Sequence, residues 1–237
     1  MSHNLATMWE LIERTWTRHR WSLPLGGLAT VAFVRLAVQV GRHQLDGFDR
    51  GIAEFVTRGR GHYDALMFGF TQLGEWKVTT PLVLGTMTWL GLRGHKRDAW
   101  FVAISAGGCA LLNTGLKLLF QRARPEQTLT YLLGPAPSFS FPSGHAMCSL
   151  GVFATLLIVL KARGFAPGFR WPLNLLVGAC LIGVATSRVY FGMHYPSDVI
   201  GGQLAGAAWV ALITGWFYPR LLPGEAVTPE HTASPPT

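Results

Sequence analysis

The chain has 237 residues, of which 49% are hydrophobic and only 14% are charged, and its formal net charge is +8 at pH 7. A soluble domain of this length carries roughly 25% charged residues, so the composition argues against a water-soluble protein and for one surrounded by lipid. The basic residues are scattered between apolar segments and form no stripe, which argues against nucleic acid as a partner.

Residues 1–20 contain no basic head followed by an apolar core, so they do not resemble a cleavable signal peptide. Apolar residues recur there at helical spacing, at Leu5, Met8, Trp9, Ile12 and Trp16. This spacing predicts a helix that lies on the cytoplasmic surface of the membrane.

Six segments then approach the roughly 20 apolar residues that a helix needs to cross a bilayer. They are Trp21–Val40, Val78–Leu92, Ala99–Phe120, Gly144–Leu160, Trp171–Tyr190 and Ser197–Tyr218. Residues 45–56 predict an amphipathic interfacial helix, Tyr63–Leu73 predicts a second short helix, and residues 223–237 predict a disordered tail. The expected fold is therefore all-α: an integral membrane bundle of about six transmembrane helices over residues 21–222, with short interfacial helices.

The distribution of basic residues favours an N-terminus inside the cell. With that orientation, ten Lys and Arg fall in inner segments and nine in outer segments. Three of the nine, Lys117, Arg124 and Arg188, lie in polar clusters described below, where binding an anion accounts for their presence. Setting these three aside leaves ten inner against six outer basic residues. These clusters then lie on the extracytoplasmic side.

Three polar clusters occur where the third span ends, the fourth begins, and the fifth joins the sixth. They are KLLFQRARP (Lys117–Pro125), PSGH (Pro142–His145) and SRVYFGMHYPSD (Ser187–Asp198). Because each span changes the side of the membrane, all three clusters are expected on the same side.

The first and third clusters supply the cations Lys117, Arg124 and Arg188. The first two are seven residues apart, so on a helix they would share a face. Pro125, however, disfavours helix at Arg124 and is expected to turn the chain there. Between Ala99 and Glu225 there are eight Lys and Arg but only two acids, Glu126 and Asp198. Cations at the edge of lipid are costly unless an anion joins them, and guanidinium groups fit phosphate oxygens.

The PSGH cluster begins the fourth span. Ser143 is a favourable N-cap residue, Gly144 permits close approach of the backbone, and a helix N-terminus attracts anions. His145 would lie beside such an anion. The alternative is an ordinary helix cap followed by a polar anchor.

His194 and Asp198 are separated by four residues, and Pro196 suits the start of a helix. A carboxylate that accepts the proton of one imidazole nitrogen leaves the other nitrogen free to act as a nucleophile. The alternative is a capping Asp beside a loop His. A hard-metal site is disfavoured because it needs several carboxylates, and Ser143 lacks the G-x-S-x-G context of a serine nucleophile.

Together, K-x6-RP, PSGH and SR-x5-H-x3-D resemble the three signature motifs of the type 2 phosphatidic acid phosphatase family, the lipid phosphate phosphatases. Every signature residue is present at the expected spacing and in the expected order. The resemblance implies a multi-pass phosphatase of a bacterial-type inner membrane, without cofactor or metal, whose active site faces the extracytoplasmic side.

The resemblance also implies a role for each residue. His194 attacks phosphorus to form a phosphohistidine, Asp198 orients His194, and His145 protonates the leaving oxygen and then activates water. The phosphate oxygens would be held by Lys117, Arg124, Arg188, Ser143 and the backbone at Gly144.

The expected substrate is a membrane lipid: phosphatidic acid, phosphatidylglycerol phosphate or undecaprenyl diphosphate. Alternatives are a phosphoryl or headgroup transferase of the same fold and a non-enzymatic transporter of anionic lipids. Vanadate-dependent haloperoxidases share similar motifs but are soluble. Gly202 and Gly206 form G-x-x-x-G, which fits either a homodimer seam or close packing within one chain.

Overall fold

The computed structural model describes residues 22–126, 138–164 and 170–218. The predicted surface helix at 1–20 and the predicted tail at 223–237 lie outside these ranges. Within the described ranges all regular secondary structure is helical, in α2 (Ser22–Gly41), α3 (Asp46–Thr57), α4 (Asp64–Leu73), α5 (Trp76–Leu92), α6 (Lys96–Phe120), α8 (Gly144–Ala162), α9 (Arg170–Tyr190) and α10 (Pro196–Phe217). The predicted all-α fold is confirmed, and each predicted span and short helix that falls within the described residues is found within three residues of its expected bounds.

Five of these helices, α2, α6, α8, α9 and α10, are long and apolar enough to cross a membrane. The sixth predicted span is α5, which has 17 residues. At 1.5 Å per residue it extends about 25 Å, at the short end of the range for a membrane span. Leu111, Leu119 and Leu175 are each more than 70% exposed, as expected for side chains that face lipid.

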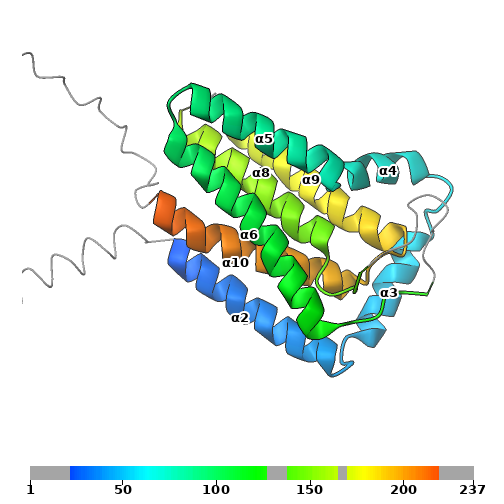
Figure 1. Ribbon diagram of the computed structural model, residues 1–237. Coiled ribbons are helices and arrows are strands. Elements are labelled where there is room, and N and C mark those ends of the chain that lie inside the picture. The colour runs from blue at the N-terminus through cyan, green and yellow to red at the C-terminus, as the bar shows by residue number, and fades with distance from the viewer. Residues whose placement is uncertain (1–21, 127–137, 165–169, 219–237) are drawn as a thin grey trace, which may run out of the picture.

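The helices form one bundle in which α10 packs between α2 and α8 (Figure 1). Helix α6 packs against α8 and α5, and α9 packs against α8 and α4. A Cβ atom at Gly202 of α10 would lie 2.5 Å from the carbonyl oxygen of Ser143, and one at Gly206 would lie 2.9 Å from that of Met147. The G-x-x-x-G face is therefore occupied by α8 of the same chain, which is the second of the two readings of that motif.

Replacing Gly202 with alanine should destabilise the bundle by about 1–3 kcal/mol, because the added methyl group overpacks the contact between α10 and α8. Gly178→Ala on α9 is the matched control, since its Cβ would meet nothing within 4 Å. The measurement is the thermal unfolding midpoint of both variants in detergent. Equal midpoints would contradict the close approach of the two helices.

An aromatic cluster supports the segment that leads into α8. Phe141, which is fully buried, stacks on Phe33 of α2 with ring centroids 5.8 Å apart. It also packs edge-on against Phe120 at the end of α6, at 5.0 Å. These contacts join α2 and α6 to the segment that immediately precedes the PSGH cluster, so the start of α8 is held in a defined place.

Candidate active site

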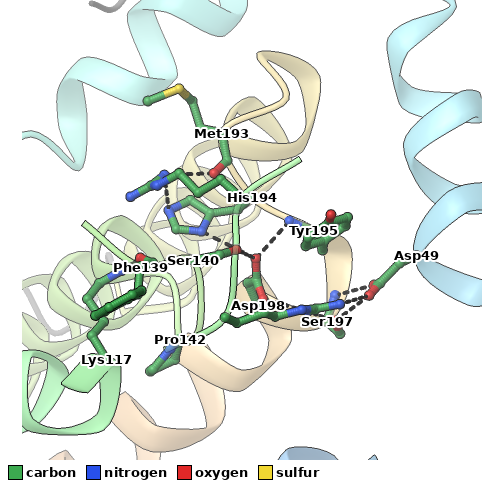
Figure 2. A network of polar contacts seen from close by, with 12 residues as sticks. Asp49, Lys117, Phe139, Ser140, Pro142, Met193, His194, Tyr195, Ser197 and Asp198 are labelled. Atoms are coloured by element: carbon green, nitrogen blue, oxygen red, sulfur yellow. Dashed lines mark hydrogen bonds and ion pairs between the residues drawn. The ribbon is translucent and has the colours of Figure 1, made fainter. Parts of the chain in front are cut away.

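The three predicted polar clusters meet at one end of the bundle, which is also the end that carries α3 and α4 (Figure 1). The residues come from the end of α6, the start of α8, the loop between α9 and α10, and the start of α10. Figure 2 shows how several of them lie around His194 and Asp198. The expectation that all three clusters share one side of the bundle is confirmed.

His194 lies in the loop after α9 and is 97% buried. Its Nε2 atom is 3.3 Å from an Nη atom of Arg124, and its Nδ1 atom is 3.5 Å from Oδ2 of Asp198. A guanidinium group only donates hydrogen bonds, so Nε2 is the accepting nitrogen and the proton belongs on Nδ1, facing the carboxylate. Burial lowers the pKa of His194 to about 3, although Asp198 acts in the opposite direction. The ring is therefore neutral at neutral pH, with a free electron pair on Nε2.

Asp198 is fully buried in the first turn of α10 and is held by several donors. The backbone N–H of Tyr195 donates to Oδ2 at 2.9 Å, which caps the start of α10, and the hydroxyl of Ser140 also donates to Oδ2. Arg122 donates to Oδ1 at 2.6 Å. The carboxylate that faces the imidazole therefore has a fixed orientation.

Three cations surround this pair. Lys117 donates to the carbonyl oxygen of Phe139, and Arg124 donates to those of Ser138 and Met193 at 2.8 and 2.7 Å. Arg188, which is 95% buried, donates to the hydroxyl of Thr71 of α4 at 2.7 Å.

Lys117 and Arg124 reach the site from different kinds of backbone, because the helix ends before Pro125, as the sequence indicated. Helix α6 ends at Phe120, and Gln121 adopts a left-handed conformation with φ of 46°. Arg124 therefore lies on a non-helical segment and shares no helical face with Lys117. Both side chains nevertheless reach the segment at residues 138–139, because the chain turns toward that segment after α6.

The PSGH cluster begins α8 as expected, with Ser143 at the N-cap position and Gly144 as the first helical residue. The backbone N–H of Ser143 donates to the carbonyl oxygen of Asp198 at 2.9 Å, which joins α8 directly to α10. A Cβ atom at Gly144 would lie 3.0 Å from Oδ1 of Asn113 on α6. The Nδ2 group of Asn113 donates to the carbonyl oxygen of Pro142 at 3.2 Å, so α6 also holds this turn.

His145 lies in the first turn of α8, beside a carboxylate that sequence reasoning missed. Its Nε2 atom is 3.3 Å from Oε2 of Glu75, the residue that precedes α5. Contact with His145 lowers the pKa of Glu75, so this carboxylate is ionised at neutral pH. A Cβ atom at the neighbouring Gly74 would lie 3.1 Å from the imidazole, so only a residue without a side chain fits there.

The buried polar atoms without a hydrogen-bond partner all belong to predicted site residues. In the part of the chain that the structure describes, these atoms are Oγ of Ser143, Nε2 of His145, Nε of Arg188 and Nδ1 of His194. The two imidazole nitrogens each face a carboxylate without forming a well-aligned hydrogen bond, whereas the atoms of Ser143 and Arg188 face neither. Buried polar groups are nearly always paired, so a group of exceptions in one place indicates a functional site. Each of these atoms can form a hydrogen bond with a ligand, and the side chain of Arg188 also carries a positive charge.

Sequence reasoning also missed Arg122 and Asp49. Neither residue is among the predicted site residues. In the structure Asp49 is 99% buried, and it accepts from an Nη atom of Arg122 at 2.8 Å. Among the described residues, no group of three or more His, Cys, Asp or Glu is placed to hold a metal ion.

The sequence profile of the PAP2 superfamily matches residues 98–221, which is more than half of the chain. The chain is 28% identical to phosphatidylglycerophosphatase B of Bacillus subtilis over 186 residues, covering 78% of this chain and 90% of that protein. It is 28% identical over 198 residues to an undecaprenyl-diphosphatase of Sulfolobus acidocaldarius, covering 82% and 88%. It is also 28% identical over 236 residues to a lipid A 1-phosphatase of Rhizobium johnstonii, covering 91% of each chain.

The fold is similar to a solved structure. The crystal structure of a transmembrane PAP2-type phosphatidylglycerolphosphate phosphatase from Bacillus subtilis superposes with a TM-score of 0.72 at 27% sequence identity. The similarity covers 81% of this chain and 95% of that one. The three clusters at the end of the bundle all lie within residues 98–221, where the superfamily profile matches.

Proposed function

The chain belongs to the PAP2 superfamily, and from this premise we propose that it is a lipid phosphate phosphatase that works without a metal ion, through a phosphohistidine on His194. The observation that carries the proposal is the pair of buried polar atoms without a partner, Oγ of Ser143 and Nε of Arg188, beside the imidazole rings of His145 and His194. A phosphate group offers oxygen acceptors for these donors, and its charge would balance the cations around them. Solved and curated relatives named as phosphatases support the same reading.

In the first proposed step, Nε2 of His194 attacks phosphorus while the bond from phosphorus to the lipid oxygen breaks. His145 donates a proton to that oxygen, so the lipid leaves as a neutral alcohol, or as a lipid monophosphate when the substrate is a diphosphate. Lys117, Arg124 and Arg188 stabilise the negative charge that develops on the phosphate oxygens. Asp198 accepts a hydrogen bond from the Nδ1–H group of His194, which stabilises the ring as it becomes positively charged.

In the second step, His145 is neutral and accepts a proton from a water molecule. The oxygen of that water attacks phosphorus, the bond to Nε2 breaks, and inorganic phosphate leaves. His194 returns to its neutral form, and His145 is protonated again for the next lipid. Glu75 lies where its negative charge favours the protonated form of His145 in the first step.

We place the site at the extracytoplasmic face of an inner membrane. The ratio of ten inner to six outer basic residues supports this orientation once the three site cations are set aside. The site lies at the ends of membrane-spanning helices, so the phosphate of a lipid could reach it while the acyl or isoprenoid chains stay in the bilayer.

The proposed function predicts phosphate release from lipid phosphates in excess EDTA. Three cations surround the site and repel a divalent metal ion, so the activity should be unchanged by the chelator. The measurement is release of inorganic phosphate by the purified protein in detergent. The panel contains phosphatidic acid, phosphatidylglycerol phosphate, undecaprenyl diphosphate and lipid A.

Activity that is lost in EDTA and restored by Mg²⁺ would overturn the metal-independent mechanism. Transfer of the phosphoryl or headgroup to an added lipid alcohol, with no free phosphate, would identify a transferase of the same fold instead. Absence of both products across the panel would favour a transporter of anionic lipids.

A further inference from the structure

A chain of charged groups joins the surface helix α3 to the nucleophile (Figure 2). Arg122 uses its two Nη atoms on different carboxylates: one is 2.6 Å from Oδ1 of Asp198, and the other is 2.8 Å from Oδ2 of Asp49. Asp49 also accepts from the backbone N–H and the hydroxyl of Ser197, at 2.8 and 2.6 Å. The ring of Tyr195 lies beneath the guanidinium group, with its centroid 4.2 Å away.

The arrangement requires an arginine. Asp49 and Asp198 are 99% and 100% buried, and a buried carboxylate is costly without a charged partner. The planar fork of a guanidinium group can serve two carboxylates at once, whereas a lysine ammonium acts as a single point charge. Arg122 therefore satisfies both acids and fixes the distance between them.

Neither Arg122 nor Asp49 is part of the three signature motifs. Arg122 lies between the motif residues Lys117 and Arg124, and Asp49 lies outside the residues that the superfamily profile matches. Arg122 is also directed at carboxylates and not toward the unpaired atoms of the phosphate site. Its contacts therefore differ in kind from those of the three site cations.

We propose that Arg122 and Asp49 are positioning residues that hold Asp198, and through it the ring of His194, in the orientation for attack on phosphorus. This inference rests on the proposed function, because it assumes that His194 is the nucleophile. Asp49 makes α3 part of the active site. Helix α3 also exposes Phe48, Ile52 and Phe55, so a helix that supports the nucleophile carries apolar side chains suited to the membrane interface.

The charges facing His194 give the proposal a specific pH signature. Asp198 faces the ring from α10, Arg124 from the segment after α6, and Arg188 from α9. Arg122 partly neutralises Asp198. Without Arg122, Asp198 would attract the protonated ring more strongly, so the pKa of His194 would rise and more of the nucleophile would be protonated as the pH falls.

The experiment compares Arg122→Gln, Arg122→Lys, Asp49→Asn and the double variant Arg122→Gln/Asp49→Asn with the wild type. Asp46→Asn is the matched control, since Asp46 lies in the same turn of α3 but is half exposed and faces His43, at 3.4 Å. We expect kcat to fall on the order of 10²-fold in R122Q and about 10-fold in D49N, with little change in KM, because the nucleophile is misplaced and phosphate binding is intact. R122K should recover part of the loss.

Two further results are expected. The ratio of the R122Q rate to the wild-type rate, in which ionisation of the substrate cancels, should fall as the pH is lowered from about 6 to about 4, toward the raised pKa of His194. The double variant should be no slower than R122Q alone, because both residues act through Asp198. A general loss of folded protein would lower all rates by the same factor at every pH, and a thermal unfolding midpoint measured for each variant monitors this.

The inference is overturned if R122Q and D49N behave like D46N, or if R122Q raises KM and leaves kcat unchanged, which would make Arg122 a phosphate ligand. Should R122Q not fold, D49N and R122K decide between the same outcomes. His194→Ala is measured alongside. If it stays active, the proposed function itself fails, whereas an inactive H194A with fully active R122Q and D49N refutes only the positioning role.

Discussion

Replacing His194 with alanine should reduce phosphate release on the order of 10⁴–10⁶-fold, the range seen when a catalytic nucleophile is removed from an enzyme. The reason is that Nε2 of His194 is the only atom to which we assign the covalent bond with phosphorus. The other site residues would still bind the lipid phosphate, so KM should change little. The measurement is the initial rate of phosphate release from phosphatidic acid in detergent micelles.

Two controls separate chemistry from folding. His194→Gln retains an N–H group and most of the side-chain volume beside Asp198, and it should be as inactive as the alanine variant. His62→Ala removes an exposed histidine from the segment between α3 and α4 and should leave the rate unchanged. A short incubation of the wild type with ³²P-labelled substrate should also give a labelled protein whose label is lost in acid and kept in alkali, and H194A should give none. Substantial turnover by either His194 variant would refute the nucleophile assignment.

The convergence of the three clusters could be predicted because it depends only on counting apolar segments. An odd or even number of spans decides the side on which Lys117, His145 and His194 lie, whatever the packing angles of the helices. The same counting applies to Glu75, which precedes the second predicted span on the same side. The signal for that residue was therefore present in the sequence, and it was missed because Glu75 belongs to no motif.

Arg122 and Asp49 could not be found in this way. The partner of an acid on an amphipathic surface helix depends on how α3 packs against α9 and α10, which is a property of the assembled bundle. Arg124 is the opposite case, a residue whose place in the site was predicted from the sequence. It reaches the site as predicted, but by a non-helical segment after Gln121 and not by a helical face. Side-chain spacing on an assumed helix is informative only where the helix continues.

Replacing His145 with alanine should slow phosphate release from phosphatidic acid by about 10²–10⁴-fold, the usual contribution of a general acid. The loss should be smaller for undecaprenyl diphosphate. A lipid monophosphate is a far better leaving group than an alkoxide, so its departure depends less on a proton from His145. The measurement is the single-turnover rate on both substrates, because release of product could otherwise hide the chemical step.

Lys117→Met is the matched comparison, since it removes a cation but no proton donor. It should slow both substrates by similar factors, because the charge on the transferred phosphoryl group is the same in each. The factors by which the two substrates slow therefore distinguish a proton donor from a phosphate-binding cation. The two factors should differ when His145 is replaced and should be the same when Lys117 is replaced. If H145A loses the same factor on both substrates, His145 acts like Lys117, by binding or orienting phosphate, and the proton must reach the leaving oxygen from another group.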